Sequence, residues 1–212
     1  MSIQRLKELQ QLNKRKGIDM LEESGRFARL ASRHEDGTAP RGVSAFNLFQ
    51  TPAAIASRMA SIIAENTEQG ATVLEPSAGL GKLYTALVMQ LDRPKITLVE
   101  ISQKCVRELY CMTEDDKKTK LISTDFLSLT NVGLFDAVCM NPPFKMGRDI
   151  KHIKHAYKML KPGGLLVSLC YNGSRQNKIL RPQVDSWEVL PDKSFKETGT
   201  GASVALLTWF KT

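Results

Sequence analysis

Residues 71–101 read ATVLEPSAGLGKLYTALVMQLDRPKITLVEI, and this stretch decides the fold. Two short apolar runs, ATVLEP and KITLVEI, enclose a glycine-containing turn and the helical stretch GKLYTALVMQL. Strands of a parallel sheet that is covered on both faces are apolar almost throughout, as these two runs are. The stretch therefore predicts a strand, a helix and a second strand parallel to the first.

The same alternation continues toward the C-terminus. It predicts a helix at SQKCVRELYCM, strands at KLISTDFL and FDAVCMN, a helix at RDIKHIKHAYKML and a strand at LLVSLCY. Two β-rich segments joined by a loop, WEVL and SVALLTWF, come last. We predict an α/β fold with a doubly wound, mostly parallel, seven-stranded sheet and a C-terminal antiparallel hairpin at one edge.

The chain divides into two predicted regions. Residues 1–45 mix basic and acidic residues and form an N-terminal helical extension, and residues 46–212 form the main domain. The main domain opens with FQTPAAIASRMASIIAEN, where Thr51 is placed as a helix N-cap and Pro52 as the first helical residue. Apolar residues recur on one face of this predicted helix, at Ile55, Met59, Ile62 and Ile63.

Composition is that of an ordinary globular protein, with 42% hydrophobic and 25% charged residues among 212. No apolar run reaches the roughly 20 residues of a membrane span, and the first residues lack the apolar core of a secretory signal. The cysteines show no metal-ligand spacing, so we expect reduced thiols and a cytoplasmic protein. These cysteines are Cys105, Cys111, Cys139 and Cys170.

The formal net charge of +8 predicts an acidic partner if the charge is clustered. Between residues 145 and 183, nine basic residues face one acid, Asp149, so this segment alone carries the chain's excess of +8. A solvated helix face is the alternative, because part of the set recurs at helical spacing. The nine are Lys145, Arg148, Lys151, Lys154, Lys158, Lys161, Arg175, Lys178 and Arg181.

Residues 135–144, FDAVCMNPPF, are a strand that stops at an amide and two prolines. Proline has a fixed φ and no backbone donor, so Pro142 and Pro143 end the strand and stiffen the chain after it. Asn141 is thereby presented at the carboxyl end of the strand, the edge where open α/β sheets bind ligands. The alternative is a strand that merely leaves the sheet through a polyproline turn.

Three further strand ends carry candidate binding groups. EPSAGLGK, residues 75–82, lets a ligand approach the backbone at a helix N-terminus, but it matches neither a dinucleotide fingerprint nor a phosphate loop. Glu100 is placed to accept both hydrogen bonds of a ribose diol. Asp125 can accept from an amino group beside the ring of Phe126. The alternatives are a tight turn, a surface glutamate, and a helix N-cap for Asp125.

FQTP, EPSAGLG, LVE, TDF and NPPF, in this order, resemble the successive motifs of class I S-adenosylmethionine-dependent methyltransferases that methylate exocyclic amino groups. The pattern is most similar to the adenine-N6 DNA methyltransferases of the γ order and spans residues 49–144. The resemblance implies a Rossmann-like methyltransferase domain over residues 46–212 with S-adenosylmethionine as cofactor. The cofactor residues that it implies are Phe49, Gln50, Thr51, Pro52, Glu75, Pro76, Ser77, Ala78, Gly79, Gly81, Glu100, Ile101, Asp125, Phe126 and Asn141.

The resemblance also implies a catalytic set, Asn141, Pro142, Pro143 and Phe144. The side-chain oxygen of Asn141 and the Pro142 carbonyl would accept the two N–H bonds of the target, and Phe144 would stack on a base turned out of its helix. Cytosine-C5 chemistry would need a cysteine after a proline, and no such pair occurs. The implied substrate-binding residues are Phe144, Lys145, Lys151, Lys154 and Phe195, with an apolar hairpin anchor as the alternative for Phe195.

We expect adenine N6 in DNA to be the target, ahead of a purine in ribosomal or transfer RNA. No segment has room for a target-recognition domain, so we expect weak selectivity, specificity borrowed from a partner or a homodimer, or action on RNA. Glutamine N-methylation and a non-catalytic nucleic-acid-binding subunit are further alternatives. No metal is expected, although His152 and His155 lie near Asp149 in the sequence, because further ligands at suitable spacing are missing.

Overall fold

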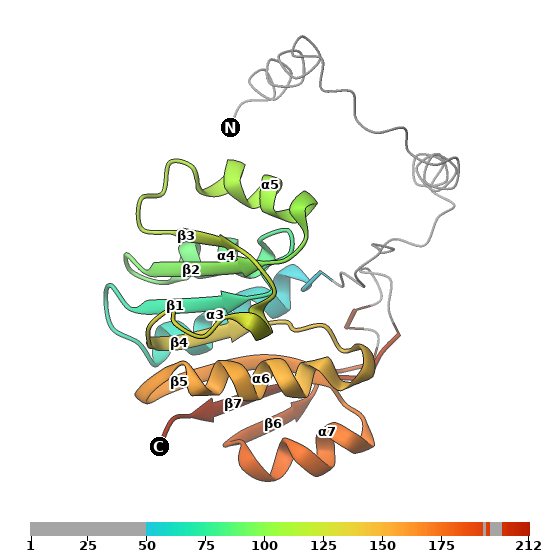
Figure 1. Ribbon diagram of the computed structural model, residues 1–212. Helices are drawn as coiled ribbons and strands as arrows, with labels where there is room; N and C mark the ends of the chain where they lie inside the picture. The colour runs from blue at the N-terminus through green and yellow to red at the C-terminus, as the bar shows by residue number, and fades with distance from the viewer. Residues whose placement is uncertain (1–49, 193, 196–200) are drawn as a thin grey trace, which may run out of the picture. The chain divides into compact units, whose positions relative to one another are not determined.

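The computed structural model describes residues 50–192, 194–195 and 201–212, so the predicted N-terminal extension and Phe49 lie outside the described residues. Figure 1 shows a seven-stranded sheet in the order β3-β2-β1-β4-β5-β7-β6. The strands are β1 (Thr72–Pro76), β2 (Lys95–Glu100), β3 (Lys120–Ser123), β4 (Phe135–Met140), β5 (Leu160–Tyr171), β6 (Ser186–Val189) and β7 (Val204–Phe210).

The predicted doubly wound sheet with an antiparallel hairpin is confirmed. β3, β2, β1, β4 and β5 run parallel, because each connection between them crosses over a face of the sheet. β7 pairs antiparallel with both β5 and β6, so the last strand lies inside the sheet and β6 forms the edge. Strand order reverses between β1 and β4, and in open α/β sheets ligands bind at such a point.

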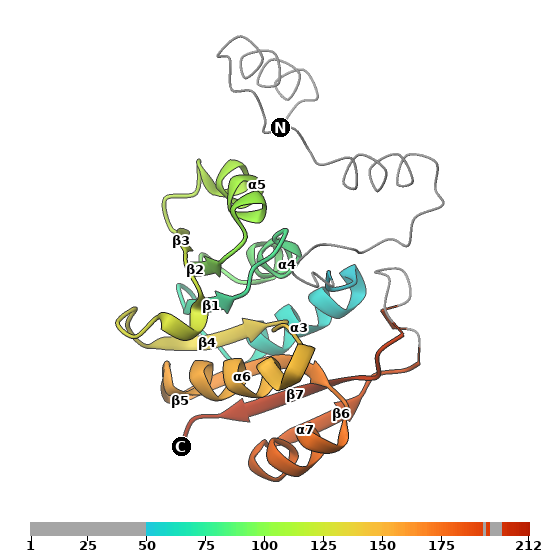
Figure 2. The same cartoon turned by 45° about the vertical axis from the view of Figure 1, so that its right-hand side comes forward.

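Helices cover both faces of the sheet (Figures 1 and 2). One apolar cluster joins the sheet to α3 (Ala53–Glu65), α4 (Lys82–Gln90) and α5 (Gln103–Thr113), and a second joins it to α6 (Arg148–Lys158) and the C-terminal side of α7 (Ser174–Ile179). Alternate residues of β4 enter different clusters: Ala137 and Cys139 face the first, Val138 and Met140 the second. Burial on both faces explains why these strands are apolar almost throughout.

Local boundaries differ from the sequence prediction at three places. Helix α3 has Pro52 as its N-cap residue, and the Thr51 side chain makes no capping bond, since its hydroxyl bonds to Asn141 instead. Strand β3 ends at Ser123, and Asp125 caps a 3₁₀ turn (Phe126–Ser128) by accepting from the Leu127 amide at 3.0 Å. The N-cap alternative for Asp125 is therefore the observed arrangement. The short helix α7 was not predicted.

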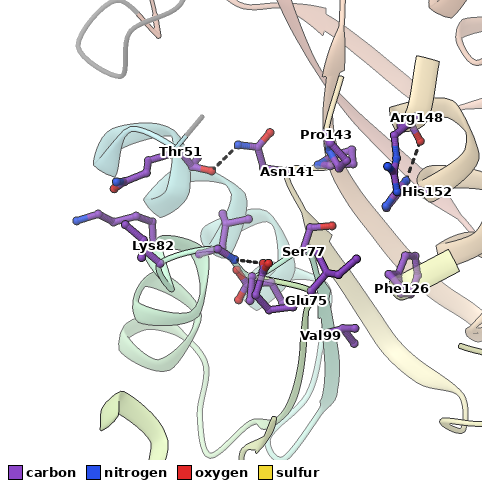
Figure 3. Close-up of a pocket in the computed structure, with 18 of the residues that line it drawn as sticks. Thr51, Glu75, Ser77, Lys82, Val99, Phe126, Asn141, Pro143, Arg148 and His152 are labelled. Carbon is purple, nitrogen blue, oxygen red and sulfur yellow. Dashed lines mark hydrogen bonds between the residues drawn. The ribbon is translucent and has the colours of Figure 1, made fainter. Parts of the chain in front are cut away.

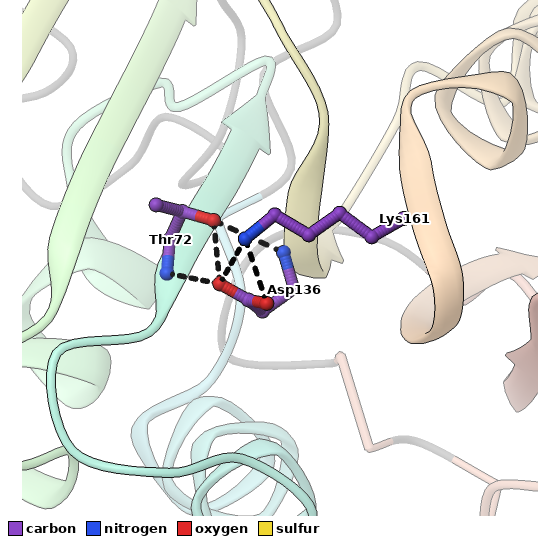
Figure 4. A network of polar contacts seen from close by, with 3 residues as sticks. All are labelled: Thr72, Asp136 and Lys161. Atoms are coloured by element: carbon purple, nitrogen blue, oxygen red, sulfur yellow. Dashed lines mark hydrogen bonds and ion pairs between the residues drawn. The ribbon is translucent and has the colours of Figure 1, made fainter.

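A polar cluster joins β1, β4 and β5 at the amino end of β1 (Figure 4). Asp136 accepts from the Thr72 amide at 2.8 Å and the Thr72 hydroxyl at 2.7 Å, and Lys161 Nζ lies 2.9 Å from both carboxylate oxygens. Desolvation acts to raise the pKa of Asp136, but the hydrogen bonds from Thr72 and Lys161 outweigh it and hold the pKa at about 2. This cluster links three neighbouring strands at the end of the sheet opposite the candidate site.

The cysteines and the length of the helices bear on two features that the sequence predicts. Cys139 and Cys170 are buried in strands, as expected, Cys105 is also buried, and Cys111 is exposed. Among the described helices, none combines the length and the apolar character that crossing a bilayer requires.

Candidate functional site

The predicted motifs meet in one pocket beside the carboxyl ends of β1, β2 and β4 (Figure 3). Its walls come from the segment before α3, the loop after β1, the end of β2, the 3₁₀ turn after β3 and the loop after β4. The predicted site residues that line it are Gln50, Thr51, Glu75, Ser77, Ala78, Gly79, Glu100, Ile101, Asp125, Phe126, Asn141, Pro142, Pro143 and Phe144.

The loop after β1 is tied to the end of β2. The amides of Ser77 and Ala78 both donate to the Val99 carbonyl, at 2.8 and 3.0 Å. Ser77 has φ +83°, a left-handed conformation that a residue with a side chain rarely adopts and that is typical of functional sites. Gly81 has φ +74°, which strains any residue with a side chain, and a Cβ there would lie 3.0 to 3.1 Å from the side chains of Met112 and Leu109, closer than ordinary contact. The loop after β1 therefore has a fixed conformation that lines the pocket, which a tight turn alone would not require.

Glu100 is held at the end of β2 by two backbone donors. Its Oε2 accepts from the Gly79 amide at 2.8 Å, and its Oε1 accepts from the Ser102 amide at 2.7 Å. The residue is 5% exposed and lines the pocket, so it is not the surface glutamate of the alternative interpretation. A carboxylate has about four acceptor positions, which leaves capacity for a ligand's hydroxyl groups.

Glu75 is the most unusual group in the pocket wall. It is 1% exposed, and its Oε2 has no hydrogen-bond partner in the described part of the chain. Burial and then the charge of Glu100 raise the pKa of Glu75 well above its ordinary value, although a hydrogen bond from the Tyr84 backbone acts to lower it. A buried carboxyl without a partner is costly, so this atom is suited to a positively charged ligand group.

The opposite wall is made by the 3₁₀ turn and helix α6. Asp125 Oδ2 lies 3.6 Å from Arg148 Nη2, an exposed ion pair that contributes little to stability. The Phe126 ring is 3% exposed and packs against the ring of His152, with centroids 5.8 Å apart. His152 Nδ1 donates to the Arg148 carbonyl at 2.8 Å, and burial lowers the pKa of His152. Helix α6 thereby supports the side of the pocket that Asp125 and Phe126 form.

The NPPF segment reaches the pocket from the end of β4. Asn141 Nδ2 donates to Thr51 Oγ1 at 3.1 Å, a contact that Figure 3 shows as a dashed line. Because the amide nitrogen is directed to Thr51, the side-chain oxygen lies on the opposite branch of the amide. Phe144 is partly buried and packs against the first apolar cluster. The segment therefore combines a fixed amide and an aromatic ring in one wall.

Several predicted residues lie elsewhere. Pro52, Pro76, Gly81, Lys145, Lys151 and Lys154 do not line the pocket, although each lies on an element that borders it or follows it. Phe195 is 1% exposed and belongs to the first apolar cluster, so it offers no free ring face to a base. The alternative interpretation of Phe195, an apolar anchor of the hairpin, agrees with this burial.

Seven further residues line the pocket that were not named as site residues, although four of them, Leu80, Lys82, Val99 and Thr124, lie within the predicted motifs. The other three are Leu83, Arg148 and His152. Lys82 is exposed at the first position of α4, directly after the glycine loop. Arg148 and His152 lie four residues apart on α6, a spacing that places them on one helix face. The sequence could have indicated these two residues, because the helix that carries them was predicted to follow NPPF directly.

One ring nitrogen of His152 and one of His155 each form a hydrogen bond within the protein. His155 Nε2 donates to the Leu129 carbonyl at 2.8 Å, and Asp149 is fully buried, where Gln176 Nε2 donates to its carboxylate at 2.9 and 3.0 Å. Within the described ranges, no group of three or more histidine, cysteine, aspartate or glutamate side chains is placed to hold a metal ion.

A family model described as "Methyltransferase small domain" matches residues 55–196. The chain belongs to this methyltransferase family. The match includes the loop after β1, the end of β2 and the NPPF segment, which are parts of the pocket wall, and it begins after Gln50 and Thr51. No curated protein matches the chain in sequence.

Solved structures agree with the methyltransferase fold. A Listeria monocytogenes protein assigned to the class I S-adenosylmethionine-dependent methyltransferases has a TM-score of 0.66 at 17% identity, over 87% of this chain and 66% of its own. A Pyrococcus horikoshii protein assigned as an RNA methyltransferase has a TM-score of 0.62 at 18% identity, over 79% and 89%. This chain therefore spans just under two thirds of the Listeria protein.

The N-methyltransferase NodS of Bradyrhizobium japonicum, in complex with S-adenosyl-L-homocysteine, has a TM-score of 0.60 at 15% identity, over 86% of this chain and 97% of its own. The family match shows that the chain is a methyltransferase domain, and S-adenosylmethionine is the cofactor that the sequence resemblance implies for it. The chemistry of the pocket fits this cofactor, because its methionine end carries positive charge and the unpartnered Glu75 Oε2 lies in the pocket wall.

Proposed function

We propose that this methyltransferase modifies the N6 amino group of adenine in DNA. The observation that carries the proposal is the Asn141 amide, which Thr51 orients in the wall of the pocket beside the rigid Pro142–Pro143 pair. An amino nitrogen conjugated to a purine is a poor nucleophile, because its lone pair is delocalised. Acceptors that take both N–H bonds would move this nitrogen toward tetrahedral geometry and free the lone pair.

Asn141 Oδ1 and the Pro142 carbonyl would be these acceptors, and Phe144 would stack on the target base. When bound, S-adenosylmethionine would supply a methyl group from a positively charged sulfur. The target nitrogen would take this methyl group as the carbon–sulfur bond breaks, S-adenosylhomocysteine would leave, and one N–H proton would pass to water. Positioning supplies much of the rate in such a reaction, so no covalent nucleophile is required. Cys139, two residues before Asn141, is buried in the first apolar cluster and does not line the pocket, so it is not placed to act as one.

The cofactor would be held by groups on the other walls. Glu75 would face the cationic methionine end, together with Gln50, Thr51 and the loop after β1. Glu100 would accept from the ribose hydroxyl groups with its remaining acceptor positions. Asp125 and Phe126 would border the adenine, supported by Arg148 and His152 of α6.

A purine in RNA is the second candidate target. The Pyrococcus horikoshii protein assigned as an RNA methyltransferase favours it, as does the lack of room for a recognition domain in the methyltransferase region. Both targets would present an exocyclic amino nitrogen to Asn141, N6 of adenine or N2 of guanine, so the same acceptors would serve either polymer.

The test is to incubate the full chain and the Asn141→Ala variant with isotope-labelled S-adenosylmethionine and, separately, duplex DNA, single-stranded DNA, total RNA and a protein extract. Each polymer is digested and the labelled product is identified by mass. We expect N6-methyldeoxyadenosine from the parent and none from Asn141→Ala, while cofactor affinity stays nearly unchanged. Asn131→Ala, at an exposed position outside the pocket, is the matched control. Label only in RNA or in protein glutamine would overturn the proposed target.

A further inference from the structure

Met146 combines two unfavourable features directly after the NPPF segment. Its side chain is 84% exposed, the highest value among the exposed large apolar residues of the described part, where Met89 follows at 80%. Its backbone has φ +58° and ψ 23°, a left-handed conformation inside the 3₁₀ turn Lys145–Gly147. For a residue with a side chain, such a conformation costs on the order of 1 to 3 kcal/mol and persists only where neighbouring structure holds it.

Neighbouring groups hold this turn in place. The Gly147 amide donates to the Phe144 carbonyl at 3.2 Å, and Arg175 Nη1 of α7 donates to the Met146 carbonyl at 3.4 Å. Gly147 has φ +72°, and a Cβ at this position would lie 2.9 Å from Arg175 Nη1. The turn is therefore supported from α7 and directs Met146 away from the apolar clusters, which do not include it.

The surroundings of Met146 are cationic. Lys145 and Arg148 flank it in the sequence, Arg175 contacts its carbonyl, and all three side chains are exposed. Double-stranded nucleic acid has phosphates on the outside and stacked bases inside. The cations around Met146 could contact the phosphates while its apolar side chain contacts the bases. Methionine is unbranched and polarizable, so it can enter a narrow gap between bases.

We propose that Met146 is a wedge that enters the base stack of a double-stranded nucleic acid and fills the place left by the target base. This inference rests on the proposed function, in which the target base turns out toward Asn141 and Phe144. Extruding a base from a duplex costs a few kcal/mol, and an apolar side chain in the vacated place offsets part of that cost. Lys145, Arg148 and Arg175 would hold the flanking phosphates while the wedge enters.

The experiment compares Met146→Ala with Met146→Leu, which keeps an apolar wedge, and with Met89→Ala, which removes an equally exposed methionine from α4. Single-turnover methylation is measured on a duplex, on the same strand without its complement, and on a duplex with a mismatch at the target. Fluorescence of 2-aminopurine at the target position reports base extrusion separately from chemistry. Calorimetry with S-adenosylmethionine checks that each variant is folded.

We expect Met146→Ala to slow methylation of the paired duplex by about tenfold and to reduce the 2-aminopurine signal, because extrusion loses its wedge. The single strand and the mismatched duplex should be methylated at nearly the parental rate, and Met146→Leu should restore most of the loss. Met89→Ala should behave as the parent does on every substrate.

Three results would overturn the wedge while leaving the proposed function intact. These are parental rates for Met146→Ala on the duplex, an equal loss on paired and single-stranded substrate, or a parent enzyme that methylates only single strands. Failure of the proposed function is a separate outcome, because the parent protein would then leave adenine unmethylated in every DNA substrate, whether paired, mismatched or single-stranded.

Discussion

Asn141 Nδ2 donates to Thr51 Oγ1 at 3.1 Å, so two residues 90 positions apart in the sequence share one hydrogen bond in the wall of the pocket. The bond joins the segment before α3 to the end of β4. Because Nδ2 is directed to Thr51, the side-chain oxygen of Asn141 points away from Thr51. The proposed chemistry requires this orientation, since the oxygen is the acceptor. Thr51 is therefore a positioning residue for Asn141 as well as a pocket residue.

Replacing Thr51 with valine should lower kcat, because valine keeps the shape of threonine but cannot accept from Asn141. A neutral hydrogen bond contributes about 1 kcal/mol, which corresponds to roughly a fivefold loss of rate. Thr51→Ser keeps the hydroxyl and should retain most of the activity. Steady-state kinetics of both variants, with cofactor affinity from calorimetry, separates this effect from weaker binding. Equal rates for the two variants would remove Thr51 from the positioning role.

Glu100→Ala should weaken S-adenosylmethionine binding by tenfold or more, since a hydrogen bond to a charged group contributes ~1.5 to 3 kcal/mol. The structure adds a second effect: the Gly79 and Ser102 amides lose their acceptor, so the melting temperature should fall as well. Isothermal titration calorimetry measures the first effect and thermal unfolding the second. Glu108→Ala, at an exposed position of α5, is the control, and an unchanged affinity for Glu100→Ala would place Glu100 outside the cofactor site.

The stability of the ligand-free protein should depend on pH through Glu75. Burial and the charge of Glu100 raise the pKa of Glu75 above its ordinary value, so the folded state holds the proton more tightly than the unfolded state. The contribution of this group is complete below the ordinary value of 4.5 and is lost as the pH rises toward the folded-state pKa. Thermal unfolding between pH 4 and pH 8 should show this loss for the parent and less of it for Glu75→Gln.

Binding of the cofactor should release the Glu75 proton, because a positive charge nearby favours the carboxylate. Calorimetry in two buffers of different ionisation enthalpy counts the protons released when S-adenosylmethionine binds. The count should fall toward zero for Glu75→Gln, and also for the parent with 5′-methylthioadenosine, which lacks the positive charge. The same count for the parent and Glu75→Gln would show that another group releases the proton.

Polymer affinity should come mainly from phosphate contacts with the basic segment from Lys145 to Arg181. Lys151 and Lys158 of α6 are exposed and Lys154 is half-buried, so we expect the first two to matter most. Changing all three to glutamine should weaken binding and flatten its dependence on salt concentration, with cofactor affinity unchanged. The control changes Lys117, Lys118 and Lys120, three exposed residues at the amino end of β3.

Titrations of labelled DNA and RNA at several salt concentrations provide the measurement. If the Lys151, Lys154 and Lys158 triple variant binds like the parent at every salt concentration, the row is an ordinary solvated face. Residues 1–45 would then be the next segment to examine for polymer contacts.

The order of strands and helices followed from the sequence because each element has its own local signal. Apolar runs such as that of β4 are buried on both faces, and Pro142 and Pro143 stop that strand whatever surrounds it. Helix α3 was predicted from its apolar face, and Met59 and Ile63 on that face are fully buried. The pocket could be placed at the carboxyl edge of the sheet for the same reason, since parallel strands end at one edge.

Other features depend on contacts between distant segments, which no local pattern encodes. Thr51 matches the pattern of a helix cap, and only the packing of α3 beside β4 turns its hydroxyl toward Asn141. Phe195 was predicted to stack on a base, but folding buries it in the first apolar cluster. Arg148 lines the pocket because α6 packs beside the turn that follows β3. Folding also buries Glu75 and leaves its Oε2 without a hydrogen-bond partner in the described part of the chain. The sequence by itself determined most of the elements and the stop of β4 at Pro142 and Pro143, whereas desolvation and long-range contacts, which arise only on folding, decided the remaining boundaries and how the polar groups are used.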